Sequence, residues 1–341
     1  MQTSDFGVFI YPFHPSGLAP SVRPYVTLAQ RLEELGFRSV AIGHLTRIPP
    51  STEAALGVEG PRPTLIDPLL LLPVIAAATR ELRLGLHAAA VSAHHPYHWA
   101  RFFAALDSIS GGRVDAGMCI GVDDKDIRAT GGTTGARGAM ADEAVALIKR
   151  LWTQSEVTHR GRFFNARGAS IEPKPVQTPH PPIWWGGGLP AIPRAARYCD
   201  YILPYLLTPS EVQNELVPRL RCEAEKWGRP VKIAQVLWIE ITDELANVDE
   251  EVWPIYERVY AKRSSATPWG KSYSRGELSK VHAIGTSKQV AQRLQEFHES
   301  GVSHMLLDFS VHGAKPLGHV HRQLDLFVDR VMPLFRKEVG Q

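Results

Sequence analysis

Residues 82–121 read LRLGLHAAAVSAHHPYHWARFFAALDSISGGRVDAGMCIG. An apolar run is followed by a polar crest, an amphipathic segment, a glycine turn and a second apolar run, which is the pattern of a strand–helix–strand unit. Two strands joined in this way are parallel, because the helix carries the chain back to the starting edge of the sheet. The crest collects His87, Ser92, His94 and His95. Polar side chains at such carboxyl ends of barrel strands are typical of active sites.

The same alternation of apolar runs and helical periodicity continues along the chain. Runs typical of buried strands lie at residues 6–11, 39–42, 82–91, 113–118, 183–185, 199–203, 231–241 and 304–309. Helical stripes separate them, which predicts parallel pairing throughout. We predict an α/β fold, a (β/α)8 TIM barrel with insertions. A doubly wound sheet is less favoured because no dinucleotide-binding fingerprint follows an early strand.

We expect one domain over residues 1–341, with insertions near 153–182 and 242–281. Long segments at the catalytic end of a barrel are often lids, so we expect the second insertion to close over the site. Four aromatic residues of this insertion suggest a partly apolar substrate: Trp253, Tyr256, Trp269 and Tyr273.

Composition excludes several classes of protein. The chain is 44% hydrophobic and 21% charged, with a net charge of +3, which is typical of globular proteins and gives no basic stripe for nucleic acid. Its three cysteines are far apart, which argues against a disulfide framework or a thiolate metal site. The start MQTSDFGVFIYP does not resemble a secretory signal, and no apolar run is long enough to span a membrane. We therefore expect a cytoplasmic protein without a membrane partner.

Histidines are the first candidates for chemistry at the predicted rim. His44 ends a strand and follows Gly43, and it could hold a proton or stabilise an anion, although a surface or otherwise satisfied histidine is the better interpretation of one histidine taken alone. His87 lies in an apolar strand, either as a core histidine or beside a flat ligand in the space that its small neighbours leave. His94 and His95 fit a structural turn better than a metal site, because neighbouring residues point to opposite sides and no carboxylate lies at ligand spacing.

Gly186, Gly187 and Gly188 directly follow the strand at 183–185 and precede a predicted helix at 190–198. Backbone amides at such a turn can bind a phosphate, while a plain tight turn is the alternative. Arg137 begins a helix and could pair with that phosphate, or it could be a solvated arginine.

Two further features have an ordinary interpretation beside a functional one. Cys119, just past a strand, is most often a small buried hydrophobe. Trp184 and Trp185 could flank a planar ligand, although strand alternation requires one of them to be ordinary packing.

The stretch HPYHWARFFAALDSISGGRVDAGMCIG, residues 95–121, resembles the signature of the bacterial luciferase-like monooxygenase family. Three further stretches resemble family segments in the same order. They are LIKRLWTQSEVTHRGRFFN at 147–165, PVQTPHPPIWWGGG at 175–188 and AIGTSKQVAQRLQEFHESGVSHMLL at 283–307.

The resemblance implies a TIM barrel that holds a reduced flavin, or a deazaflavin, at its carboxyl mouth. His44 matches the family's histidine at the end of the second strand. His87-Ala88 matches a non-prolyl cis peptide under the isoalloxazine ring, and Cys119 a position near the flavin. The turn from Gly186 to Leu189 matches the loop that holds the flavin phosphate.

Two positions depart from the family pattern. Ile120 stands where luciferases have an arginine that pairs with the flavin phosphate, so the countercharge must come from elsewhere, with Arg137 as the candidate. Gly43 stands where sugar-phosphate dehydrogenases of the deazaflavin branch have an aspartate, which favours FMN.

The resemblance therefore implies a flavin-dependent monooxygenase that uses O2 and reduced FMN from a separate flavin reductase. Its substrate is a small, partly apolar organic molecule, and His44 assists the oxygen chemistry or moves a proton. Alternatives are hydride transfer with 8-hydroxy-5-deazaflavin, a catalytically silent flavin-binding protein, and a metal-dependent barrel hydrolase. The family commonly forms homodimers. No metal ligand set is assigned.

Overall fold

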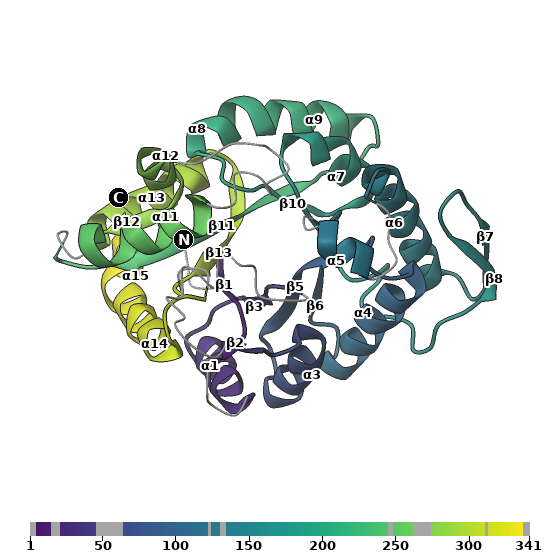
Figure 1. Ribbon diagram of the computed structural model, residues 1–341, viewed down its shortest axis with the longest axis horizontal. Coiled ribbons are helices and arrows are strands. Elements are labelled where there is room, and N and C mark those ends of the chain that lie inside the picture. The colour runs from purple at the N-terminus through teal and green to yellow at the C-terminus, as the bar shows by residue number, and fades with distance from the viewer. Residues whose placement is uncertain are drawn as a thin grey trace.

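The computed structural model describes residues 5–14, 21–45, 64–121, 124–129, 134–244, 248–261, 274–310 and 313–336. Figure 1 shows the strands as a central ring with the helices packed around it. None of the helices in these ranges is long and apolar enough to cross a membrane.

Eight parallel strands close the barrel. In ring order they are β1 (Phe6–Ile10), β3 (Ser39–Ile42), β5 (Arg83–Ala90), β6 (Val114–Cys119), β9 (Ile183–Gly186), β10 (Tyr201–Leu203), β11 (Lys232–Ile241) and β13 (Val302–Asp308). Pairing of β10 with β11, and of β13 with β1, closes the ring. Each strand lies where the sequence predicts one, so the TIM-barrel prediction is confirmed.

Helices cover the outside of the barrel. The helices around the ring are α1 (Arg23–Glu34), α3 (Pro68–Ala78), α4 (Pro96–Ser110), α6 (Arg137–Thr153), α7 (Ile192–Tyr198), α9 (Val217–Glu225), α13 (Ser287–Glu299) and α14 (Leu317–Leu326). Further helical segments are α5 (Asp124–Ala129), η2 (Leu189–Ala191), α8 (Pro209–Glu211), η3 (Val212–Leu216), η4 (Val248–Val252), α11 (Trp253–Ala261), α12 (Arg275–Val281), η5 (Phe327–Val331) and α15 (Met332–Arg336). A short antiparallel pair joins β2 (Phe13–His14) to β4 (Thr64–Leu65).

The insertion near 153–182 is more regular than the sequence suggests. Its strands β7 (Val157–Arg160) and β8 (Asn165–Ala169) form an antiparallel hairpin that stands outside the ring of helices in Figure 1. The Glu143 carboxylate of α6 anchors the turn by accepting the amides of Phe163 and Phe164 at 3.1 and 2.8 Å. The hairpin is thus held on the barrel through α6.

The insertion near 242–281 packs on the barrel through an apolar cluster. Its segments η4, α11 and α12 enclose Leu206 and Trp238. Trp253 and Tyr256 are only 6% and 0% exposed, so their rings fill this cluster and do not face an open substrate space. Trp269 and Tyr273 lie outside the described residues.

Along the edge that faces away from β10, the long strand β11 has two partners in succession. Residues 233–238 pair with β13, and residues 239–241 pair with β12 (Ala283–Gly285). His282, just before β12, accepts the Trp238 amide on Nδ1 at 3.3 Å and stacks on the indole at 4.2 Å. β12 therefore lies outside the closed ring.

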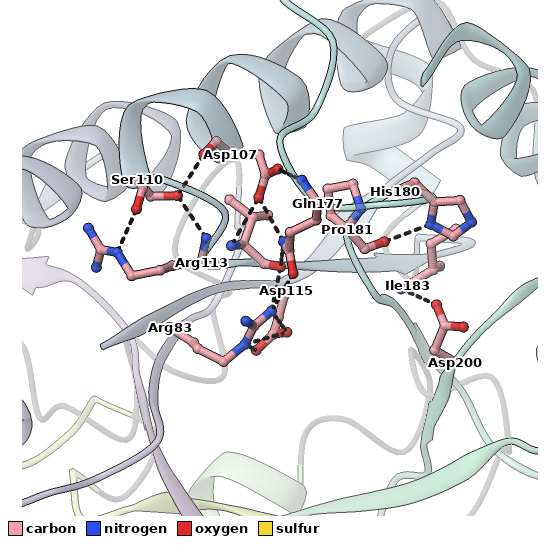
Figure 2. A network of polar contacts seen from close by, with 11 residues as sticks. Arg83, Asp107, Ser110, Arg113, Asp115, Gln177, His180, Pro181, Ile183 and Asp200 are labelled. Carbon is pink, nitrogen blue, oxygen red and sulfur yellow. Dashed lines mark hydrogen bonds and ion pairs between the residues drawn. The ribbon is translucent and has the colours of Figure 1, made fainter. Parts of the chain in front are cut away.

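The family-like stretch builds a polar framework at the amino ends of the strands, which Figure 2 shows. Asp107 of α4 is fully buried, and its carboxylate accepts the amides of Val114, Val176 and Gln177 and the side-chain amide of Gln177 at 2.7–3.3 Å. These bonds tie α4 to β6 and to the segment that leads into β9.

Arg113 completes the framework on the other side of α4. Its guanidinium donates to the carbonyls of Ala76, Thr79, Leu82 and Ser110 and to the Thr79 hydroxyl, at 2.6–3.0 Å. It thereby satisfies carbonyls at the C-terminal end of α3. Asp107 and Arg113, which belong to the family-like stretch, are therefore structural, and they lie away from the carboxyl rim.

Candidate active site

The barrel interior leaves room for one imidazole beneath the mouth. A Cβ on Gly85 would lie 2.5 Å from Cδ2 and Nε2 of His87, and a Cβ on Gly117 would lie 2.5 Å from its Nδ1. The ring of His87 therefore occupies the space that two inward-facing glycines provide. Of the two directions that strand alternation allows, the side chain points into the barrel.

His87 is a buried and neutral histidine. Its ring meets the indole of Trp184 edge-to-face at 5.0 Å, and Nδ1 has no hydrogen-bond partner among the described residues. Burial lowers the pKa of His87 to about 4, against a weaker opposing effect of Asp115. The peptide bond from His87 to Ala88 is cis, as the resemblance implies.

Three of the predicted residues converge at the carboxyl ends of β5, β6 and β9. A Cβ on Gly186 would lie 3.6 Å from the Cβ atoms of Ala88 and Cys119, and the Cys119 thiol donates to the Ala88 carbonyl at 3.7 Å. Burial raises the pKa of Cys119 to about 11, so the thiol stays protonated at neutral pH. These three small and uncharged residues therefore line one side of the barrel mouth.

The glycine turn continues from this side of the mouth. The amide of Gly187 donates to the Leu203 carbonyl at 3.1 Å. No acceptor among the described residues takes up the amides of Gly188 and Leu189. The predicted helix at 190–198 begins as the 3-10 turn η2 and continues as α7. Two adjacent free amides are suited to bind an anion.

His44 lies at the end of β3 with its ring against α4. It is half-buried, and its ring meets the indole of Trp99 edge-to-face at 5.4 Å; His94 meets the same indole at 5.4 Å. The space beside Gly43 is filled by the ring of Tyr11, which a Cβ would approach within 2.4 Å. Gly43 therefore leaves space for a neighbouring side chain.

The turn at His94 and His95 is structural. Nδ1 of His95 accepts the Tyr97 amide at 3.2 Å and so caps α4. The ring of His95 meets Phe164 at 5.4 Å, while that of His94 meets Trp99, so the two side chains diverge as predicted.

Arg137 is already engaged at the start of α6. Its guanidinium pairs with Asp124 at 3.0 Å and donates to the carbonyls of Gly121 and Thr134 at 3.1 and 3.2 Å. Its charge is therefore balanced by Asp124, and Arg137 is not among the residues that line the pocket beside the glycine turn.

Neither indole of the tryptophan pair is free to flank a ligand. Trp184 points into the barrel and stacks on Tyr201 at 4.0 Å, whereas Trp185 points outward under the guanidinium of Arg194 at 4.9 Å. Both are buried to at least 99%.

Sequence reasoning missed the polar interior of the barrel. The indole of Trp184 lies 5.4 Å from the buried ring of His304, and the Arg83 guanidinium pairs with the buried Asp115 at 2.7 Å. These residues occupy inward positions of β9, β13, β5 and β6. Alternation along each strand assigns these residues to inward positions. Polar residues there are a recognisable signal, because the side chains inside a TIM barrel are usually apolar and branched.

A double-mutant cycle tests the position of the His87 ring. We expect Gly85→Ala alone to lower the free energy of unfolding by about 1–3 kcal/mol, because the new methyl group collides with the imidazole. In a His87→Ala background the same change should cost little, giving a coupling energy of about 1 kcal/mol or more in urea unfolding.

Gly117→Ala is the matched control for this cycle. Its Cβ would also meet the Leu86 carbonyl at 2.2 Å, a clash that removing the imidazole does not relieve. Equal costs of Gly85→Ala in both backgrounds would show that the ring lies elsewhere.

Comparisons with known proteins agree with this architecture. A model of the family described as luciferase-like monooxygenase matches residues 4–304. An FMNH(2)-dependent dimethylsulfone monooxygenase of Pseudomonas putida is 26% identical over 297 residues, which cover 77% of each chain.

Solved structures with the same fold include two oxidoreductases. An F420-dependent secondary alcohol dehydrogenase has a TM-score of 0.79 at 18% identity, covering 97% of this chain and 98% of its own. A long-chain alkane monooxygenase has a TM-score of 0.78 at 18% identity, covering 99% of this chain and 92% of its own. At such identities the likeness shows the fold alone.

A closed parallel barrel with a glycine turn and an inward-turned histidine at its carboxyl rim is the framework of a TIM-barrel enzyme. The match over most of its length shows that the chain belongs to the luciferase-like monooxygenase family.

Proposed function

We propose that the protein is a flavin-dependent monooxygenase that uses reduced FMN and O2 to oxidise a small, partly apolar organic substrate. The observation that carries the proposal is the convergence of Ala88, Cys119 and Gly186 beside the amides of Gly188 and Leu189, which have no acceptor among the described residues. We propose that residues 1–341 act as a single catalytic domain in the cytoplasm, supplied with reduced FMN by a separate flavin reductase. The FMNH(2) dependence of the dimethylsulfone monooxygenase supports this assignment.

The residues at the mouth fit a flavin. Gly186 lacks a Cβ where a flat ring would lie against Ala88 and Cys119, and the amides of Gly188 and Leu189 can donate to a phosphate. The neutral His87 forms part of the floor below them. Bound reduced flavin supplies the reaction with oxygen, while the protein positions the ring and excludes water.

His44 holds or moves a proton at the rim in this proposal. Its half-buried imidazole is oriented by the edge-to-face contact with Trp99. An imidazole at this position can stabilise a developing oxygen anion or donate a proton to it.

The second candidate is hydride transfer with 8-hydroxy-5-deazaflavin. One observation favours it, since an F420-dependent alcohol dehydrogenase shares the fold over nearly the whole chain. Gly43, which stands in place of an aspartate, favours FMN.

Titration of the purified protein with each cofactor, followed by absorbance and fluorescence, separates the candidates. We expect micromolar or tighter binding of FMN or its reduced form, and O2 consumption when a flavin reductase is added. Binding of deazaflavin alone would support the second candidate. Flavin binding without turnover of organic substrates, in a screen that includes dimethyl sulfone, would indicate a silent binding protein.

The role of His44 predicts a change in oxygen chemistry with little change in cofactor affinity. When the reduced FMN complex of His44→Ala is mixed with O2, we expect hydrogen peroxide to appear about 100-fold faster than in the wild type. Exposed His98 on α4 gives the matched control, His98→Ala. Equal peroxide release in all three proteins would remove His44 from the mechanism.

We also propose that two copies associate through α3 and α4. Leu70 and Val74 on α3 are 71% and 41% exposed, and Ile109 on α4 is 57% exposed. The two helices lie side by side on the outside of the barrel in Figure 1. Leu70 and Val74 lie one helical turn apart, and exposed apolar side chains so placed favour a self-complementary contact between identical chains.

Sedimentation velocity tests the dimer. We expect the wild type to sediment with twice the mass of one chain and the double variant Leu70→Glu, Val74→Glu with the mass of one. Trp227→Glu changes another exposed apolar residue and should leave the dimer intact. A monomeric wild type would overturn the proposal.

A further inference from the structure

A pocket of about 770 Å³ adjoins the glycine turn. Gly188 and Leu189 form one of its walls, and Lys280 of α12 and Arg293 of α13 lie in the lining as well. We call it the turn pocket. It therefore brings together two unused amides and two cationic side chains from distant parts of the sequence.

Most of the charged groups of the turn pocket have partners. The carboxylate of Glu211 accepts the amide and hydroxyl of Thr208, and that of Glu277 accepts those of Ser274. Glu296 pairs with Arg293 at 3.2 Å.

The guanidinium of Arg293 also donates hydrogen bonds to the carbonyls of Lys280 and Ser279, at 2.5 and 3.4 Å. The ammonium group of Lys280 makes no ion pair or hydrogen bond with any described residue, and its side chain is exposed. Among the charged side chains of this lining, Lys280 alone is left without a partner within the described ranges.

Two arginines, Arg137, which the sequence suggested, and Arg194 of α7, are committed elsewhere. Arg137 pairs with Asp124. Arg194 pairs with Asp142 at 2.6 Å and donates to the Gly138 carbonyl at 2.7 Å. Since Ile120 provides no charge, a dianion at the turn needs a cation from another part of the chain.

We propose that Lys280 supplies the countercharge for a phosphate group bound at the amides of Gly188 and Leu189. In assigning this phosphate to FMN, the inference rests on the proposed function. A free phosphate ion, or the phosphate group of a separate small molecule, would bind to the same amides and the same ammonium group. The four-carbon stem of lysine is flexible and places the ammonium far from the backbone, and each backbone amide donates along a fixed direction. α12 thereby becomes part of the cofactor site.

The experiment compares FMN with riboflavin, which lacks the phosphate. Fluorescence titration at low ionic strength gives both dissociation constants for the wild type and for Lys280→Met, which keeps the length of the stem without the charge. We expect Lys280→Met to weaken FMN about fivefold and to leave riboflavin unchanged. Lys280→Arg should restore most of the difference.

Two matched controls accompany the test. Lys288→Met removes an exposed lysine from α13 outside the turn pocket, and Arg137→Gln removes the cation that the sequence suggested. Both should keep the wild-type ratio of FMN to riboflavin affinity. The Lys280 effect should also shrink as salt rises, because screening weakens a partly exposed ion pair.

The outcomes are distinct. If inorganic phosphate protects the wild type but not Lys280→Met against thermal unfolding while the flavin ratio stays unchanged, the phosphate belongs to a separate molecule. An unchanged ratio together with no phosphate effect overturns the inference and leaves the proposed function standing. If neither FMN nor riboflavin binds the wild type, the proposed function fails, and the phosphate arm alone decides the role of Lys280.

Discussion

Asp107→Ala should lower the free energy of unfolding by about 3–5 kcal/mol, because it leaves buried donors without an acceptor. The Asp107 carboxylate accepts four hydrogen bonds, three of them from backbone amides, and the residue is fully buried. Water has no access to replace the lost oxygens. The loss should appear in urea unfolding as a lower midpoint with an unchanged slope.

Asp107→Asn separates hydrogen bonding from simple packing. The amide keeps one acceptor oxygen and nearly the same volume, so we expect a smaller loss than for alanine. Asp329→Ala on η5, which is exposed, should change stability by less than about 0.5 kcal/mol. A loss below about 1 kcal/mol for Asp107→Ala would contradict the framework role that Figure 2 illustrates.

The protein should lose stability steeply on mild acidification. Burial lowers the pKa of His87 to about 4 and those of His282 and His304 to about 3. In the unfolded chain a histidine titrates near 6.5, so the unfolded state takes up protons first as the pH falls. Stability is therefore complete above about pH 6.5 and is lost as the pH falls toward the folded pKa values. Each histidine contributes about 1.4 kcal/mol per pH unit.

Urea unfolding at pH 7, 6 and 5 measures this effect. The three histidines together predict a loss of about 4 kcal/mol between pH 6 and pH 5, above the range in which most carboxylates titrate. His304→Gln should reduce that loss by about a third, whereas His298→Gln at an exposed site should not. A flat profile over this interval would show that the imidazoles are charged or solvated in the folded state.

The strands were predictable because burial on both faces leaves a continuous apolar run. Residues 39–42 are the clearest case, since the run SVAI is the strand β3 itself. The stretch that resembles the family contains Asp107 and Arg113, which hold the fold together through hydrogen bonds to several backbone groups. The fold needs these two side chains whichever reaction takes place at the barrel mouth. A strong signal for architecture therefore carried little information about substrate.

The site was only partly predictable. The positions of Ala88, Cys119 and Gly186 follow from strand ends, which meet at one rim in any parallel barrel. Arg137 pairs with Asp124, and the Lys280 ammonium has no partner within the part of the chain that the structure describes. Both facts depend on how loops and helices pack, which hydrophobic periodicity does not report. The hairpin β7–β8 was missed because its strands are half exposed and lack an apolar run.

The change of partner along β11 has a consequence for variation within such barrels. Because β12 pairs only with residues 239–241, the chain between the two strands can be shortened, lengthened or exchanged for another module without breaking a pairing between two strands of the closed ring, provided that His282 is kept as the acceptor of the Trp238 amide. A different connecting segment can thus be inserted between β11 and β12 while the barrel stays the same. Diversification of the mouth and maintenance of the barrel become separable tasks for evolution and for the protein engineer.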